Sequence, residues 1–128
     1  MNILVVEDDP DARKVLSLIL KLDGFEVSTV SGGREAIDAI RAAAPDLILL
    51  DVMMPDVDGF EVCRRIRSEP ATRGIPIVML SGKADQESVV RGLAAGANEF
   101  LSKPIKPSSL TKQLRSTLMR TAASMSTS

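Results

Sequence analysis

Histidine, tryptophan and tyrosine are absent from this chain of 128 residues, and cysteine occurs once, as Cys63. Without histidine the chain can form no histidine-based metal site, no histidine general base and no catalytic triad that depends on one. A single cysteine excludes an intrachain disulfide framework and thiolate-rich zinc sites. Chemistry at a functional site of this protein must therefore use carboxylates, hydroxyls and lysines.

The chain also lacks an excess of positive charge and a long apolar run. Lys and Arg total 16 against 17 Asp and Glu, for a formal net charge of −1, so we expect no direct contact with nucleic acid. No apolar stretch approaches the length of a membrane span, and the amino terminus MNILVVEDD has no signal-peptide features. The balance of 45% hydrophobic and 26% charged residues is typical of a soluble globular protein. We expect a cytoplasmic protein without membrane contact.

Short apolar segments alternate with segments of helical periodicity along the chain. Asp9 is expected to cap the first helix, because it precedes Pro10 at the start of a pattern of helical spacing. We expect strands at residues 3–6, 25–30, 46–50, 75–80 and 100–101, and helices that include residues 12–22, 36–40, 60–66, 85–96 and 110–118.

Five strands, each followed by a helix, predict an α/β fold with a parallel sheet and helices on both faces. The strands are nearly all apolar, as expected when helices cover both faces of a sheet. Because 128 residues are too few for an eight-stranded barrel, an open doubly wound sheet remains. We expect one domain over residues 1–120, followed by a disordered tail of small polar residues at 121–128.

Polar side chains occur at the carboxyl ends of four of the five expected strands. Glu7 and Asp8 follow the first strand, and Asp51 ends the third. Ser81 follows the fourth strand, and Lys103 lies just after the fifth. Because ligands bind beyond these strand ends in a doubly wound sheet, we expect the five side chains to meet. Taken singly, each has a structural explanation such as a helix cap or a turn, but their shared position favours a functional site.

Three adjacent carboxylates beside a lysine and a hydroxyl indicate phosphoryl chemistry. The carboxylates repel one another, and one takes a proton unless a cation screens them. Oxygen-only ligands select a hard cation such as Mg²⁺, which uses one or two carboxylates and keeps several waters. A carboxylate beside such a cation can attack phosphorus and form an aspartyl phosphate. By contrast, the pair Gly32-Gly33 lacks the G-x-G-x-x-G context, so we expect no dinucleotide site.

Four ordered motifs resemble the receiver domains of two-component response regulators, of the chemotaxis-regulator type, over residues 2 to about 119. They are ILVVEDDP, DLILLDVMMPDVDGFEVCRRIR, IPIVMLSG and FLSKP. The resemblance implies a flavodoxin-like, five-stranded parallel sheet of order 2-1-3-4-5. It also implies a Mg²⁺-dependent transfer of a phosphoryl group from a phosphohistidine, which switches a protein-interaction surface.

The resemblance implies a role for each residue at the metal. Asp51 corresponds to the phosphoacceptor, and Glu7 and Asp8 to the acidic pair. Asp8 and Asp51 would bind Mg²⁺ directly, Glu7 would act through a water, and the backbone carbonyl of Met53 would complete the coordination. Glu7 stands where the family more commonly has Asp.

Three further residues correspond to the positions that respond to phosphorylation. Ser81 would donate a hydrogen bond to the phosphoryl group, Lys103 would form an ion pair with it, and Phe100 occupies the aromatic switch position. The family more commonly has Thr at the position of Ser81 and Tyr at that of Phe100. The hydroxyl is therefore kept at the first position, whereas the phenolic hydrogen bond is lost at the second.

Three functional hypotheses fit the carboxylate cluster. The leading one is a response regulator that catalyses only its own phosphorylation and dephosphorylation, with a sensor histidine kinase or histidine phosphotransfer protein and a downstream protein target as partners. The second is an aspartyl-phosphate phosphohydrolase, but such enzymes generally carry a second acid at the position of Met53. The third is a binding module that is never phosphorylated. A stand-alone regulator, a segment of a longer protein and a phosphorylation-dependent dimer all fit the sequence.

Overall fold

Five apolar segments form the strands of one parallel sheet in the computed structural model, which describes residues 1–82 and 85–126, with side chains to residue 121. The sheet order is β2-β1-β3-β4-β5 and every pairing is parallel, so the predicted fold class and strand order are confirmed. The strands are β1 (Asn2–Val6), β2 (Glu26–Val30), β3 (Leu47–Asp51), β4 (Ile77–Ser81) and β5 (Glu99–Ser102).

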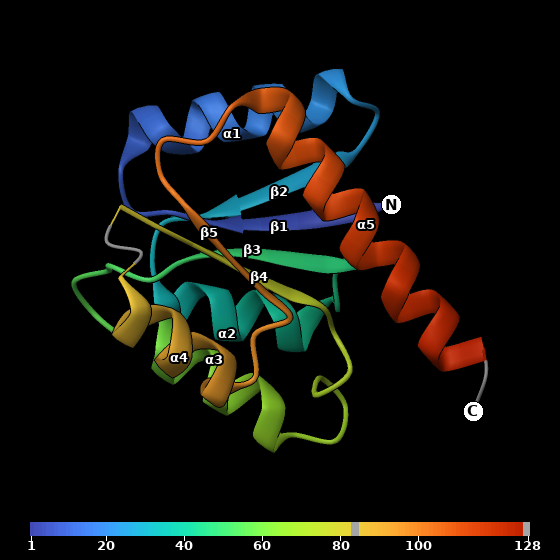
Figure 1. Ribbon diagram of the computed structural model, residues 1–128. Coiled ribbons are helices and arrows are strands. Elements are labelled where there is room, and N and C mark those ends of the chain that lie inside the picture. The colour runs from blue at the N-terminus through green and yellow to red at the C-terminus, as the bar shows by residue number, and fades with distance from the viewer. Residues whose placement is uncertain (83–84, 127–128) are drawn as a thin grey trace.

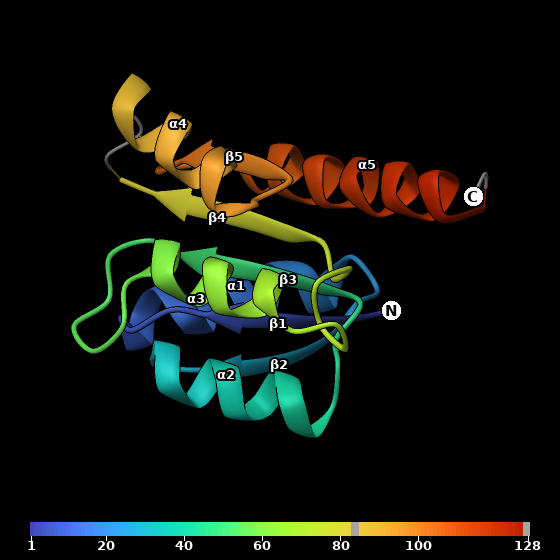
Figure 2. The same ribbon diagram turned by 90° about the horizontal axis from the view of Figure 1, so that it is seen from below.

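Helices cover both faces of the sheet (Figures 1 and 2). Side chains of a strand alternate between its faces. In β3, Leu47 and Leu49 therefore pack under one pair of helices, while Ile48 and Leu50 pack under the other three. The first layer is α1 (Pro10–Leu22) and α5 (Pro107–Ser126), and the second is α2 (Gly33–Ala42), α3 (Gly59–Ser68) and α4 (Gln86–Ala95).

Aspartate side chains start three of the helices just beyond the carboxyl ends of strands. Asp9 caps α1 by accepting a hydrogen bond from the Ala12 N–H at 3.0 Å, as predicted. Asp58 caps α3 and Asp85 caps α4 in the same way. These caps therefore fix where α1, α3 and α4 begin, on the side of the sheet where the polar residues lie.

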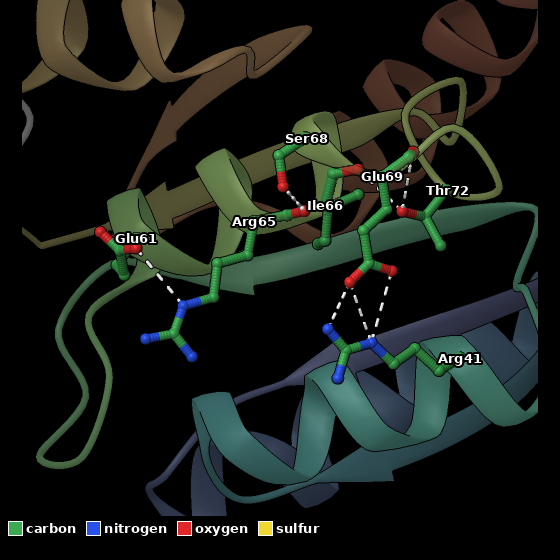
Figure 3. A network of polar contacts seen from close by, with 7 residues as sticks. All are labelled: Arg41, Glu61, Arg65, Ile66, Ser68, Glu69 and Thr72. Atoms are coloured by element: carbon green, nitrogen blue, oxygen red, sulfur yellow. Dashed lines mark hydrogen bonds and ion pairs between the residues drawn. The ribbon is translucent and has the colours of Figure 1, made fainter.

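A polar network fastens the far end of α3 to α2 (Figure 3). Glu69, just after α3, accepts hydrogen bonds from the Arg41 guanidinium of α2. The buried Thr72 hydroxyl donates to the Ile66 carbonyl at 2.7 Å, which satisfies the last turn of α3. These contacts hold α3 in place from the end opposite its cap.

The carboxyl end of α5 differs from the sequence-based expectation. A polar tail was expected from residue 121, but the helical backbone continues to Ser126, and residues 127–128 lie outside the described part. The segment contains Ala and Met, which favour helix. Figures 1 and 2 both show α5 running past the amino ends of the strands. The domain division at residue 120 stays a prediction.

Among the described residues, no helix combines the length and apolarity needed to span a bilayer.

Candidate functional site

Two buried acids lie side by side at the carboxyl edge of the central strands. Val6 of β1 is paired with Leu50 of β3. The residues that follow them, Glu7 and Asp51, are 1% and 6% exposed. Asp8 is exposed, and one oxygen of each of the three carboxylates lies within 4.8 Å of the others. The cluster predicted from the strand ends is therefore formed.

Lys103 reaches this cluster from the segment after β5. Its ammonium nitrogen lies 2.7 Å from Glu7 Oε1 and 3.6 Å from Asp51 Oδ1. Its backbone N–H donates to the carbonyl of Ser81 at 2.8 Å, which fixes the lysine beside the end of β4. The lysine is thus positioned by backbone pairing and neutralises part of the acidic charge.

The two buried acids differ in their affinity for a proton. Burial, together with a hydrogen bond and the charge from Glu7, raises the pKa of Asp51 to about 7, although Lys103 opposes the shift. Burial also disfavours the charged form of Glu7, but hydrogen bonds from Asp51 and Lys103 outweigh it and lower the pKa of Glu7. Burial also disfavours the charged form of Lys103, but its hydrogen bond to Glu7 and the negative charges of Asp51 and Glu7 outweigh burial and raise the pKa of Lys103. The two acids therefore do not ionise independently, and a proton bound by the pair is favoured on Asp51.

The donor set of the cluster fits a divalent cation. Glu7 Oε2 is buried without a hydrogen-bond partner among the described residues, and such an oxygen is costly to leave unpaired. Glu7, Asp8 and Asp51 together offer carboxylate oxygens close to one another, a donor set that suits a hard cation. A cation would also compensate the repulsion that otherwise protonates Asp51.

The other predicted residues, Met53, Ser81 and Phe100, lie in the loop after β3, at the end of β4 and on β5. The N–H of Met53 donates to Asp51 Oδ1 at 3.3 Å, so the loop after β3 folds back over the carboxylate. Ser81, the last residue of β4, is 1% exposed. Phe100 lies on β5, and its ring packs against α4 rather than on the acids: a Cβ added to Gly92 would lie 2.7 Å from Phe100 Cδ2. The roles assigned to these residues stay predictions.

Comparison with protein families identifies a family that has both this fold and an acidic cluster at this position. The family model described as the response regulator receiver domain matches residues 3–115. This chain belongs to the response regulator receiver domain family. The predicted resemblance is confirmed, and with it the predicted function of a phosphorylation-activated receiver in a two-component system.

Relatives and solved structures agree with this assignment. The receiver domain is 42% identical over 119 residues to the DNA-binding response regulator MtrA of Mycobacterium tuberculosis, covering 93% of this chain and 51% of that protein. It is 42% identical over 119 residues to the transcriptional regulatory protein CseB of Streptomyces coelicolor, covering 93% of this chain and 50% of that protein. The chain thus spans about half the length of these relatives.

Two solved structures illustrate the shared fold. A putative response regulator from Chloroflexus aurantiacus superposes with a TM-score of 0.89 at 36% identity, over 92% of this chain and 97% of that one. The chemotaxis response regulator CheY4 of Vibrio cholerae gives 0.86 at 35% identity, over 91% and 97% of the two chains.

The site of the receiver domain also depends on a glycine that sequence reasoning did not single out. A Cβ added to Gly59 would lie 2.7 Å from the Asp51 carbonyl oxygen and 2.8 Å from Val52 Cα. Gly59 therefore lets the start of α3 approach the phosphoacceptor segment closely. In the sequence this glycine marks only the start of a helix, so no local signal reveals the contact.

Proposed function

We propose that Asp51 accepts a phosphoryl group from the phosphohistidine of a sensor histidine kinase or a histidine phosphotransfer protein, in a Mg²⁺-dependent reaction. The observation that carries this proposal is the environment of Asp51. Its carboxylate is buried at a strand end, with the Lys103 ammonium at 3.6 Å and two further carboxylates within 4.8 Å. This combination serves phosphoryl transfer, in which a positioned nucleophile and compensation of charge supply most of the catalysis.

The transfer forms a bond from an Asp51 carboxylate oxygen to phosphorus and breaks the bond from phosphorus to the donor imidazole nitrogen, which takes up a proton from solvent. Asp51 attacks as a carboxylate, so a proton that it holds passes to solvent before the transfer. Mg²⁺ held by Glu7, Asp8, Asp51 and the Met53 carbonyl would neutralise negative charge on the phosphoryl oxygens. The Met53 N–H and Lys103 hold Asp51 Oδ1 in one orientation.

The new phosphoryl group is then bound by residues of the neighbouring strands. Ser81 donates its hydroxyl to a phosphoryl oxygen, and Lys103 exchanges Glu7 for the phosphoryl group. Because the Lys103 backbone N–H donates to the Ser81 carbonyl, a shift of Ser81 toward the phosphoryl group is coupled to the shift of Lys103. The Phe100 ring, which packs on α4, follows them and remodels the face of α4, β5 and α5 for a downstream protein target or a second copy of the domain.

The domain acts on itself rather than on other substrates in this proposal. A phosphohydrolase would use a second acid at the position of Met53, whose side chain is apolar and 65% exposed.

We propose a cytoplasmic location for this domain. We also propose that this segment makes no direct contact with nucleic acid, since its formal net charge is −1. MtrA, described as DNA-binding, is about twice as long as this chain.

Incubation with acetyl phosphate and Mg²⁺, followed by intact mass measurement, tests the proposal. We expect one phosphoryl adduct on the unmodified sequence and none on Asp51→Asn. Asp58→Asn is a matched control, because Asn also caps helices and α3 keeps its start. An adduct that forms equally on Asp51→Asn, or no adduct on any variant, would overturn the proposal.

A further inference from the structure

The loop of residues 52–58, which follows Asp51, is bound to the amino end of α2 by one carboxylate. Asp56 Oδ1 accepts a hydrogen bond from the Gly33 N–H at 3.1 Å, and Oδ2 accepts one from the Arg34 N–H at 3.1 Å. The N-cap residue of α2, Gly32, has no side chain to do this. Asp56 therefore caps α2 from a different part of the chain.

The glycine pair at the amino end of α2, Gly32 and Gly33, makes this contact sterically accessible. A Cβ added to Gly32 would lie 2.9 Å from Asp56 Oδ2, and one added to Gly33 would lie 2.7 Å from the Val57 carbonyl oxygen. Backbone hydrogen bonds from Val57, Arg34 and Gly33 lower the pKa of Asp56 to about 2. The carboxylate is therefore charged throughout the neutral range and complements the positive end of the helix dipole.

The same loop is closed against the phosphoacceptor strand at its other side. The Gly59 N–H donates to the Val52 carbonyl at 2.9 Å, and Gly59 lies against the Asp51 backbone. Between these anchors, the Met53 N–H donates to Asp51 Oδ1. The Met53 side chain is exposed, so core packing does not fix it. Its position therefore depends on the two contacts that hold the loop, Asp56 with α2 and Gly59 with Val52.

We propose that Asp56 is a positioning residue for the phosphoacceptor site: by binding the loop of residues 52–58 to α2, it holds Met53 over Asp51 and sets the affinity of the site for Mg²⁺. This inference rests on the proposed function, because it assigns Met53 to the metal site. Asp56 touches neither the acids nor the phosphoryl group and acts only through the loop. Residues that orient a metal ligand from outside the coordination sphere typically change affinity about 10–100-fold when removed.

Magnesium binding to the unphosphorylated protein, measured by calorimetry, provides the test. We expect Asp56→Ala to weaken Mg²⁺ binding about 10-fold, and Asp56→Asn, which keeps one acceptor oxygen, to restore part of the loss. Hydrogen exchange at the backbone N–H groups of residues 52–58, other than Pro55, should accelerate in Asp56→Ala. The matched control is Asp46→Ala, because the exposed Asp46 carboxylate also accepts a backbone hydrogen bond, from Asn2 at 2.7 Å, but at the opposite edge of the sheet.

Equal Mg²⁺ affinities of Asp56→Ala and Asp46→Ala, while the unmodified sequence binds Mg²⁺ and forms its adduct, would overturn the inference and leave the proposed function intact. If the unmodified sequence forms no phosphoryl adduct, the proposed function itself fails. Should Asp56→Ala not fold, Asp56→Asn decides the question, and a Mg²⁺ affinity equal to that of Asp46→Ala again counts against the inference.

Discussion

The Lys103 ammonium group donates a hydrogen bond to Glu7 Oε1 at 2.7 Å, so the lysine of the unmodified site is bound to an acid. Asp51 Oδ1 lies 3.6 Å from the same nitrogen. One ammonium group is therefore within reach of both carboxylates. Phosphorylation of Asp51 would require only that the lysine exchange one oxygen partner for another, without a large movement of β5.

Replacing Lys103 tests this relationship through stability. Lys103→Ala leaves the buried Glu7 carboxylate without its cation, and we expect a loss of about 1–3 kcal/mol in the free energy of unfolding. The loss is smaller than for a fully buried ion pair, because the Lys103 side chain is 32% exposed. Urea denaturation without divalent cations measures it. Lys112→Ala, at an exposed position on α5, is the control, and an equal effect of the two substitutions would contradict the account.

The pH dependence of stability should reveal the raised pKa of Asp51. Folded Asp51 has a pKa of about 7, against about 3.9 in an unfolded chain, so the folded state binds more protons between these values. Stability from this group is present at low pH and is lost as the pH rises through 7. We expect a contribution of about 2–4 kcal/mol, from about 1.4 kcal/mol per unit of pKa.

Urea denaturation between pH 5 and 8, in a metal-free buffer, measures this slope. Asp51→Asn should lack the decline and be the more stable protein at pH 8. Addition of Mg²⁺ at pH 8 should stabilise the unmodified sequence by mass action and Asp51→Asn much less. A decline of the same size in Asp51→Asn would show that another group causes it.

The close approach of Gly59 to Asp51 predicts a penalty for any side chain at that position. Alanine favours helix over glycine by about 1 kcal/mol, but a Cβ at Gly59 would lie 2.7 Å from the Asp51 carbonyl oxygen. We expect the clash to prevail, with a net loss of about 1–3 kcal/mol and slower adduct formation with acetyl phosphate. Gly74→Ala is the control, since nothing lies within 4 Å of a Cβ there. Unchanged adduct formation in Gly59→Ala would argue against the packing role.

The fold and the acidic edge were predictable because their signals are local. An apolar run that ends on Asp51 marks a buried strand and its carboxyl end, and parallel strands bring such ends together. The partner of Lys103 was not predictable, since a choice between Glu7 and Asp51 depends on distances of about an ångström that spacing does not encode. Likewise, Asp56 caps a helix 23 residues earlier in the chain, so neither segment carries a sign of the other.

The extent of α5 shows a different limit. Small polar residues after Thr121 are typical of a frayed end, yet the backbone remains helical to Ser126. Ala and Met in this segment have high helix propensity, which the polar character of its Ser and Thr residues obscured. Composition alone therefore placed the helix end too early.

Chemical identification of the phosphorylated residue distinguishes Asp51 from the other acids of the site. Borohydride reduces the acyl phosphate of an aspartate to homoserine, and peptide mass analysis then locates the converted residue. After treatment with acetyl phosphate and Mg²⁺, we expect homoserine at position 51 and at no other acid. Conversion at Asp8 in place of Asp51, or a stable adduct that borohydride does not reduce, would contradict it.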